Sequence, residues 1–222
     1  MQIDASFVTS AVDAGGFPQE RLPELAIVGR SNVGKSSLIN ALLRRQLART
    51  SATPGKTRLA NFFRVQRGAA PAFHLVDLPG YGYARGGDAS AREFQQLTDA
   101  YFSRARGAGL VRPANADLTR SAPRTTEVTI GVLLLVDSRH PGLESDLDAW
   151  RWLNSSPTTT GVTVTGVVGT KVDKLTRAER TRHVREFESL FQTPVLLVSA
   201  QTGEGLDELW KMIASLPRQT VA

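Results

Sequence analysis

Residues 29–36 have the composition and spacing of a phosphate-binding loop, GxxxxGK[ST]. A short apolar run at residues 25–28 precedes the motif, and helical spacing follows it over residues 37–43. In this setting backbone N–H groups at a helix N-terminus surround a phosphate, the lysine reaches the β- and γ-phosphates, and the serine hydroxyl ligates Mg²⁺. A glycine-rich turn that binds nothing is the alternative. We therefore predict a nucleoside triphosphate site that includes Gly29, Arg30, Ser31, Asn32, Val33, Gly34, Lys35 and Ser36.

A carboxylate follows the apolar run of residues 73–76, in the order Asp77-Leu78-Pro79-Gly80. At the end of a buried strand, Asp77 would face Mg²⁺ through water. The Gly80 N–H could approach the γ-phosphate, because glycine has no Cβ to obstruct it. A simple DxPG turn is the alternative interpretation. The pattern predicts nucleotide contacts from Asp77, Leu78, Pro79 and Gly80.

A polar, basic segment at residues 44–57 ends in Thr53-Pro54-Gly55-Lys56-Thr57. A threonine here completes the Mg²⁺ shell only when a γ-phosphate is present, which would make the segment a sensor of nucleotide state. We favour Thr57 over Thr53, since it follows the Pro-Gly turn and precedes the next strand; a plain turn is the alternative. The predicted nucleotide contacts are Gly55, Lys56, Thr57, Arg58 and Leu59. The predicted metal ligands are Ser36, Thr57 and Asp77, and the predicted catalytic residues are Lys35, Thr57 and Gly80.

Two later motifs predict that the base is guanine. In Thr170-Lys171-Val172-Asp173, the Asp173 carboxylate can accept hydrogen bonds from guanine N1–H and the exocyclic amine, while the Lys171 stem covers the ring. Adenine offers no such pair of donors, so a mismatch would leave the carboxylate unpaired. The small residues of Ser199-Ala200-Gln201 would let a backbone N–H reach guanine O6. All seven residues are predicted to bind the nucleotide.

The elements that position these motifs alternate between strand and helix. Strands are predicted at residues 25–28, 61–65, 73–76, 128–136, 162–168 and 195–198, and helices at 37–43, 91–103, 143–153, 177–191 and 206–216. This order predicts an α/β fold with a mostly parallel six-stranded sheet, one antiparallel edge strand and helices on both faces. We predict one domain at 24–217, after a lead-in at 1–23, with a flexible insertion at 104–127 and a tail at 218–222. His74 is expected to be a packed or edge histidine, not a ligand.

The composition of the 222 residues limits which binding partners and which cellular compartment we expect. Neither a cysteine nor an apolar stretch of membrane-spanning length is present, so we expect a soluble, cytoplasmic protein without membrane contact. The net charge is +6, and the interval between Glu24 and Asp77 holds nine basic residues and no acidic one. A surface of one sign between Leu25 and Val76 suggests a polyanion such as RNA. An ordinary solvated basic face is the alternative.

The wording of the motifs resembles the bacterial EngB (YsxC/YihA) family of P-loop GTPases, within the TRAFAC class. The resemblance lies in GRSNVGKSS, TPGKT, NFF, DLPGYGYA and DSRHP, and runs from about Pro23 to the last predicted helix. It implies a P-loop GTPase fold, bound GTP or GDP, and a role in assembly of the large ribosomal subunit and in normal septation. The large subunit or its rRNA is the implied partner; we expect a monomer and no DNA binding. A division protein whose ribosome contact is incidental is the alternative.

The residue after Gly80 is Tyr81, where many GTPases place a glutamine that orients the attacking water. We therefore expect slow intrinsic hydrolysis with no assignable general base. Asn32 occupies a position at which related GTPases hold K⁺ beside the phosphates, so the resemblance also suggests K⁺ dependence. A nucleotide-binding module that hardly hydrolyses GTP, and more weakly a P-loop kinase, are competing interpretations.

Overall fold

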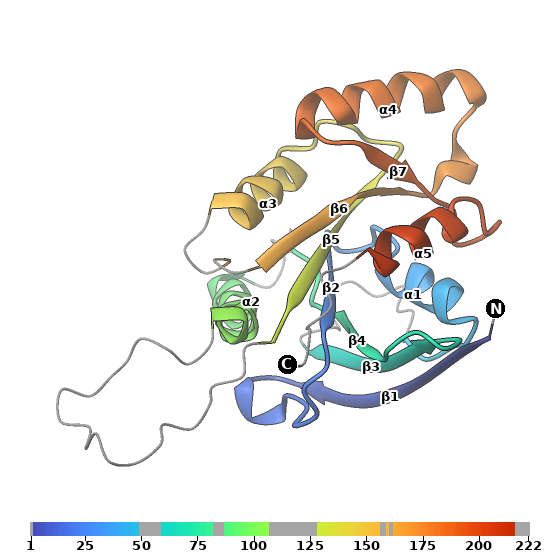
Figure 1. Ribbon diagram of the computed structural model, residues 1–222. Coiled ribbons are helices and arrows are strands. Elements are labelled where there is room, and N and C mark those ends of the chain that lie inside the picture. Colours follow the sequence, from blue (N-terminus) through green and yellow to red (C-terminus); the bar gives the residue numbers. More distant parts are fainter. Residues whose placement is uncertain are drawn as a thin grey trace, which may run out of the picture.

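The computed structural model describes residues 2–48, 59–81, 87–106, 128–155, 159 and 162–215. These residues form one sheet with helices on both of its faces (Figure 1). The strands are β1 (Ile3–Ala11), β2 (Glu24–Gly29), β3 (Ala60–Arg67), β4 (Phe73–Asp77), β5 (Ile130–Asp137), β6 (Val162–Thr170) and β7 (Val195–Leu197). The α-helices are α1 (Lys35–Leu43), α2 (Gly87–Phe102), α3 (Glu144–Ser155), α4 (Arg177–Phe191) and α5 (Leu206–Ala214). Short 3₁₀ helices are η1 (Ala14–Gly16), η3 (Ser103–Arg106) and η5 (Val172–Lys174).

The seven strands lie in the order β1-β3-β4-β2-β5-β6-β7. Strands β4, β2, β5, β6 and β7 pair in parallel, while β3 is antiparallel to both of its neighbours. The predicted α/β fold with a mostly parallel sheet is confirmed. The predicted number of six strands is wrong, because the described residues hold seven. As a result β3, expected at the edge, is an internal strand.

The additional strand β1 comes from the predicted lead-in. It pairs with β3 from Ile3 opposite Arg67 to Ala11 opposite Ala60, with a register shift between Phe7 and Thr9. Its fully buried residues are small alanines, whereas the large Phe7 side chain is 51% exposed. An edge strand that buries methyl groups and exposes an aromatic ring carries little hydrophobic signal, so the sequence pattern does not predict it.

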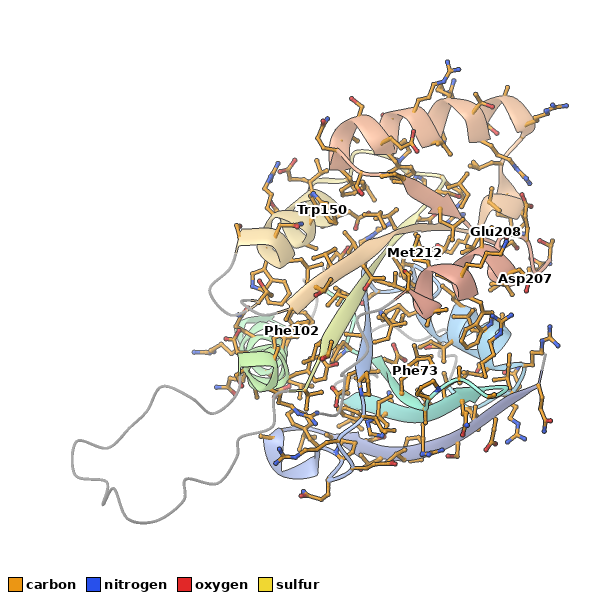
Figure 2. The ribbon with its side chains drawn as sticks, viewed as in Figure 1. Phe73, Phe102, Trp150, Asp207, Glu208 and Met212 are labelled. Atoms are coloured by element: carbon orange, nitrogen blue, oxygen red, sulfur yellow. The ribbon has the colours of Figure 1, made fainter. Side chains whose placement is uncertain are left out.

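Each face of the sheet has its own set of helices. Leu25 and Ile27 of β2 pack with α1 and α5, while Ala26 and Val28 pack on the face that α2, α3 and α4 cover (Figure 1). Figure 2 shows Met212 on α5, apart from Phe102 on α2 and Trp150 on α3. Because both faces are covered, β2 and β5 are buried at every residue. Their unbroken apolar runs in the sequence reflect this double burial.

Local capping signals set the bounds of α4. The Thr176 hydroxyl accepts a hydrogen bond from the Glu179 backbone N–H, and the Glu179 carboxylate accepts one from the Thr176 backbone N–H. The helix ends at Phe191, and Gln192 follows in the left-handed conformation with a φ of 53°. The helix predicted at residues 177–191 is confirmed with the same bounds.

A buried polar cluster lies at the amino ends of β2 and β4, away from the predicted motifs. Glu24 and His74 are buried, and an Arg104 guanidinium nitrogen lies 3.0 Å from the Glu24 carboxylate. His74 is packed, as predicted, with its ring nitrogens 3.9 Å from Glu24 and 3.8 Å from Glu20. Arg104 also lies over the Phe17 ring, 4.9 Å from its centre. A buried carboxylate needs such a counter-charge, so Arg104 ties the end of α2 to the sheet.

The predicted insertion at 104–127 begins inside the packed part of the chain. Its first three residues belong to η3, and Ala105 is only 7% exposed. Residues 107–127 and the predicted tail at 218–222 lie outside the described residues. Among the helices that are described, none combines the length and the apolar character needed to cross a membrane.

Candidate nucleotide-binding site

The predicted phosphate-binding loop joins β2 to α1 at the carboxyl edge of the sheet. Gly34 precedes α1 with a φ of 107°, and Asn32 has a φ of 63°, so two loop positions use left-handed backbone. A Cβ at Gly29 would lie 2.9 Å from Val33 Cγ1 and 3.0 Å from the Leu135 carbonyl oxygen. The first turn of α1 has neither an acidic residue nor a side-chain cap, so its N–H groups are open to an anion.

Charged and polar side chains gather beneath this loop. The Lys35 ammonium donates a hydrogen bond to the Gly29 carbonyl at 3.2 Å, and the Ser36 hydroxyl donates to Asp77 Oδ2 at 3.4 Å. Burial raises the pKa of Asp77 to about 6, although the Lys35 charge and the Ser36 hydrogen bond oppose this rise. Burial also lowers the pKa of Lys35, against the attraction of Asp77. Burial therefore disfavours the ionised forms of both side chains. A bound cation would stabilise the Asp77 carboxylate, and a bound phosphate would stabilise the Lys35 ammonium.

The donors beside Asp77 fit Mg²⁺. Asp77 Oδ1 is buried and has no hydrogen-bond partner among the described residues, and the Ser36 hydroxyl lies beside the same carboxylate. Carboxylate and hydroxyl oxygens are the ligands that Mg²⁺ prefers. Of the three predicted metal ligands, the structure thus brings Ser36 and Asp77 together. Thr57 lies outside the described residues, as do Gly55, Lys56 and Arg58, while Leu59 is described just before β3.

Gly80 lies directly against the phosphate-binding loop. A Cβ at this position would be 2.8 Å from the Ser31 backbone nitrogen, 2.9 Å from Ser31 Oγ and 3.0 Å from Lys35 Nζ. No other residue could approach the loop so closely without displacing it. Gly80 therefore lies beside the Lys35 ammonium, and the predicted contact of its N–H with a γ-phosphate stays a prediction.

Three of the predicted nucleotide-binding residues point their side chains into the core. Val33 and Leu78 are each 1% exposed, and Val172 is fully buried. The Leu78 N–H also donates to the Ile27 carbonyl at 3.4 Å, which continues the pairing between β4 and β2. At these positions only the main chain is available to a ligand, and the side chains secure the loops to the sheet.

The two predicted base-binding motifs meet in a cavity of about 390 Å³. Asp173 accepts a hydrogen bond from the buried Ser199 hydroxyl at 2.7 Å, and its other oxygen lies 3.3 Å from the Lys174 ammonium. Hydrogen bonding by Ser199 is the main reason that the pKa of Asp173 lies below its usual value. The cavity is lined by Gly34, Ser37, Leu38, Thr170, Lys171, Asp173, Lys174, Val198, Ala200 and Gln201. Sequence reasoning missed Ser37, Leu38, Lys174 and Val198 because they are neighbours of the motifs, not part of them.

Direct bonds connect the base-binding loop to the phosphate-binding loop. The Thr170 hydroxyl donates to the Val33 carbonyl at 2.6 Å, and the Lys171 ammonium donates to the Asn32 carbonyl at 2.7 Å. The same ammonium lies 2.9 Å from Asp137 Oδ2. Lys171, predicted only to cover the ring, thus also fixes one loop to the other.

Asp137, at the carboxyl end of β5, anchors this junction. Burial opposes its ionisation, but hydrogen bonds from Arg139 and Lys171 outweigh that effect and hold its pKa well below the usual range. Arg139 binds both carboxylate oxygens, at 2.9 and 2.7 Å. The DSRHP wording at residues 137–141 predicts only the family, and the structure adds this supporting role for Asp137 and Arg139.

Comparison with known proteins agrees with this geometry. A family model described as 50S ribosome-binding GTPase matches residues 24–163. The chain is 38% identical to the probable GTP-binding protein EngB of Symbiobacterium thermophilum, over 96% of this chain and 95% of that protein. It is also 38% identical to the probable GTP-binding protein EngB of Pelotomaculum thermopropionicum, over 95% of this chain and 93% of that protein.

Solved structures show the same fold at low sequence identity. Era of Aquifex aeolicus bound to GDP and AlF₄⁻ has a TM-score of 0.66 and 22% identity; the match covers 90% of this chain but 58% of the Era chain. A probable GTP-binding protein EngB has a TM-score of 0.58 and 19% identity, covering 87% of this chain and 97% of that chain. These likenesses support the P-loop GTPase fold predicted from the sequence.

Replacing Asp77 by Asn should stabilise the ligand-free protein at neutral pH. Burial raises the pKa of Asp77 from 3.8 to about 6, which means that the folded state binds this proton more tightly than the unfolded state does. Ionisation of Asp77 therefore lowers the free energy of unfolding. Its ionised form then costs the folded state roughly 3 kcal/mol at about pH 8, and this cost shrinks as the pH falls through 6. The free energy of unfolding in urea, measured without nucleotide or Mg²⁺, should therefore be higher for Asp77→Asn at about pH 8, with a smaller difference at about pH 5.

Asp148→Asn is the matched control, because Asp148 is an exposed aspartate on α3. It should change the free energy of unfolding by less than about 0.5 kcal/mol at either pH. An Asp77→Asn protein that is less stable than the wild type at pH 8 would show that the ionised carboxylate is fully compensated in the ligand-free fold.

Proposed function

The chain belongs to the EngB family of GTP-binding proteins, and from that premise we propose that it is a GTP-operated switch in assembly of the large ribosomal subunit. It is a GTP-hydrolysing enzyme. The observation that carries the proposal is the junction of a phosphate cradle, at Lys35 and Gly80, with a cavity of about 390 Å³ that Asp173 lines. The description of the matching family model, a 50S ribosome-binding GTPase, supports the ribosomal partner.

The residues of the site have separable tasks in this reaction. Backbone N–H groups of the loop and the Lys35 ammonium hold the β- and γ-phosphates, and Asp173 holds the base. Bound Mg²⁺, held by Ser36 and through water by Asp77, would supply positive charge against the phosphates. Water adds to the γ-phosphorus as its bond to the bridging oxygen breaks, which gives GDP and inorganic phosphate. Loss of that phosphate removes the partner proposed for the Gly80 N–H, which is how the site would sense the nucleotide state.

Hydrolysis without a partner should be slow in this arrangement. The described residues near the phosphate cradle include no glutamine in position to orient water, and the Tyr81 hydroxyl is bonded to Asp146 at 2.9 Å. We propose in addition that K⁺ binds beside the phosphates near Asn32, whose side chain is exposed at the loop. GTP turnover should then be faster in K⁺ than in Na⁺ at equal ionic strength, measured as phosphate release. Equal rates in the two salts would contradict the K⁺ proposal.

The rRNA contact is proposed to centre on the carboxyl end of α1. Arg44 and Arg45 are exposed there, immediately before the basic residues of the segment at 49–58, which lies outside the described residues. Other basic residues of the acid-free interval face carboxylates from elsewhere in the chain. Arg30 lies near Asp146, Arg64 near Glu20 and Arg67 near Asp207, the last labelled in Figure 2. The interval has no acidic residue in the sequence, but acidic residues from other segments lie beside it in the fold. Arg44 and Arg45 are therefore the better candidates for the rRNA contact.

Cytoplasmic action as a monomer and a requirement for normal septation complete the proposal. The septation role rests on the family resemblance, and a failure to assemble ribosomes would account for a division defect. The alternative, a GTP-gated division protein, would recruit septal partners without stable ribosome contact.

Co-sedimentation with purified ribosomal subunits tests the proposal. The protein should pellet with large subunits in a non-hydrolysable GTP analogue, and much less in GDP or without nucleotide, at moderate salt. Arg44→Glu with Arg45→Glu should weaken binding at least about tenfold, because phosphate contacts dominate such affinity. The matched control is Arg177→Glu with Arg185→Glu, two exposed arginines on α4 that should leave binding unchanged.

The GTP affinity of each variant, measured in parallel, separates loss of RNA contact from damage to the fold. Salt-sensitive binding that ignores the nucleotide would mean only that a basic surface adheres to RNA, and would contradict the switch. No association with subunits, together with recruitment to the septum, would favour the division protein.

A further inference from the structure

One buried carboxylate contacts both the phosphate-binding loop and the residue after Gly80. Asp146, in the first turn of α3, is 2% exposed. The Tyr81 hydroxyl donates to Asp146 Oδ1 at 2.9 Å, and Arg30 Nε lies 3.8 Å from the same oxygen. None of the sequence motifs includes Asp146, which lies between the DSRHP segment and the tryptophans of α3.

The main chain joins the same two segments. Tyr81 forms an isolated parallel bridge with Arg30, and the Ser31 N–H donates to the Tyr81 carbonyl at 3.1 Å. The Tyr81 side chain packs against the core beneath α2 and α3. Tyr81 is therefore held at both ends, by the phosphate-binding loop through its main chain and by α3 through its hydroxyl.

The electrostatic surroundings keep the Tyr81 hydroxyl protonated, so that it donates its hydrogen bond to Asp146. Burial raises the pKa of Tyr81 far above its usual value, and the neighbouring Asp146 charge adds to that rise, so the phenol remains a neutral donor. Burial raises the pKa of Asp146, while the Tyr81 hydrogen bond and the Arg30 charge oppose the rise. A hydrogen bond to a charged acceptor in such a site is stronger than one between neutral groups.

The position of Gly80 follows from this anchoring. Gly80 immediately precedes Tyr81, and it lies so close to the phosphate-binding loop that an added Cβ would be 2.8 Å from the Ser31 nitrogen and 3.0 Å from the Lys35 ammonium. Without the bond from Tyr81 to Asp146, the Tyr81 hydroxyl would lose its contact with α3, while the main-chain bridge and the packing of the ring would remain. We infer that Asp146 is a positioning residue for GTP hydrolysis, because its bond to Tyr81 holds the Gly80 peptide at the γ-phosphate end of the site.

This inference concerns the hydrolysis step and does not depend on the ribosomal role. It predicts a loss of rate without a loss of GDP affinity, since GDP has no γ-phosphate for Gly80 to contact. Packing alone, without positioning, would change stability and GDP affinity and leave the rate of the bound complex unaltered.

Single-turnover GTP hydrolysis and GDP binding in the full chain test the inference. Tyr81→Phe and Asp146→Ala should each lower the rate constant about five- to tenfold, the effect of losing about 1 to 1.4 kcal/mol of bond energy. Their GDP dissociation constants should stay within about twofold of the wild type. The double variant should be no slower than the slower single variant, because both changes remove the same bond.

Two further variants sharpen the result. Asp146→Asn keeps an oxygen that accepts from Tyr81 and should retain most of the rate, which also covers the case that Asp146→Ala does not fold. Asp148→Ala, an exposed aspartate two residues along the same helix that pairs with Arg151, should hydrolyse GTP at the wild-type rate. An unchanged rate in Tyr81→Phe, or losses that multiply in the double variant, would overturn the inference.

Discussion

The site depends on the bonds that join the predicted base-binding loop, residues 170–173, to the predicted phosphate-binding loop, residues 29–36. The two loops follow β6 and β2, which β5 separates in the sheet. The Thr170 hydroxyl and the Lys171 ammonium cross that distance to the Val33 and Asn32 carbonyls. The separation between the phosphate cradle and Asp173 is thereby set before a nucleotide binds. Because the two loops are already fixed relative to each other, little conformational entropy is lost when a nucleotide binds. The site therefore selects ligands whose base and phosphates have this separation.

Three buried aspartates around this junction differ in how completely their carboxylates are hydrogen-bonded, and this difference matches their different roles. Asp137 is fully satisfied by Arg139 and Lys171, so its pKa falls and it acts as a fixed anchor. Asp77 is incompletely satisfied, and burial raises its pKa, which leaves an oxygen available to a cation. Asp146 lies between these cases, with one oxygen bonded to Tyr81 and the other without a hydrogen-bond partner in the described part of the chain. The chain gives up stability at the positions where a ligand or a switch must act.

The sequence predicts this fold and site unevenly, for physical reasons. Continuous apolar runs such as β5 and the local cap of α4 predict elements well, because their signals lie within a few residues. The motif residues at Lys35 and Asp77 do lie together, since parallel strands bring their carboxyl ends to one edge. Edge strand β1 carries too weak an apolar pattern to predict. The contacts of Glu24 with Arg104 and of Tyr81 with Asp146 join residues far apart in sequence, and no local pattern encodes them.

The base preference of the wild type and of Asp173→Asn tests the central claim, that these loops form one site for a guanine nucleotide. Affinities for GDP and for xanthosine diphosphate would be measured by calorimetry in Mg²⁺. The wild type should prefer GDP, and Asp173→Asn should prefer xanthosine diphosphate, because an amide can donate to the xanthine oxygen that replaces the guanine amine. We expect each preference to be about 100-fold or more. An Asp173→Asn protein that still prefers GDP would contradict the assignment of this pocket to the base.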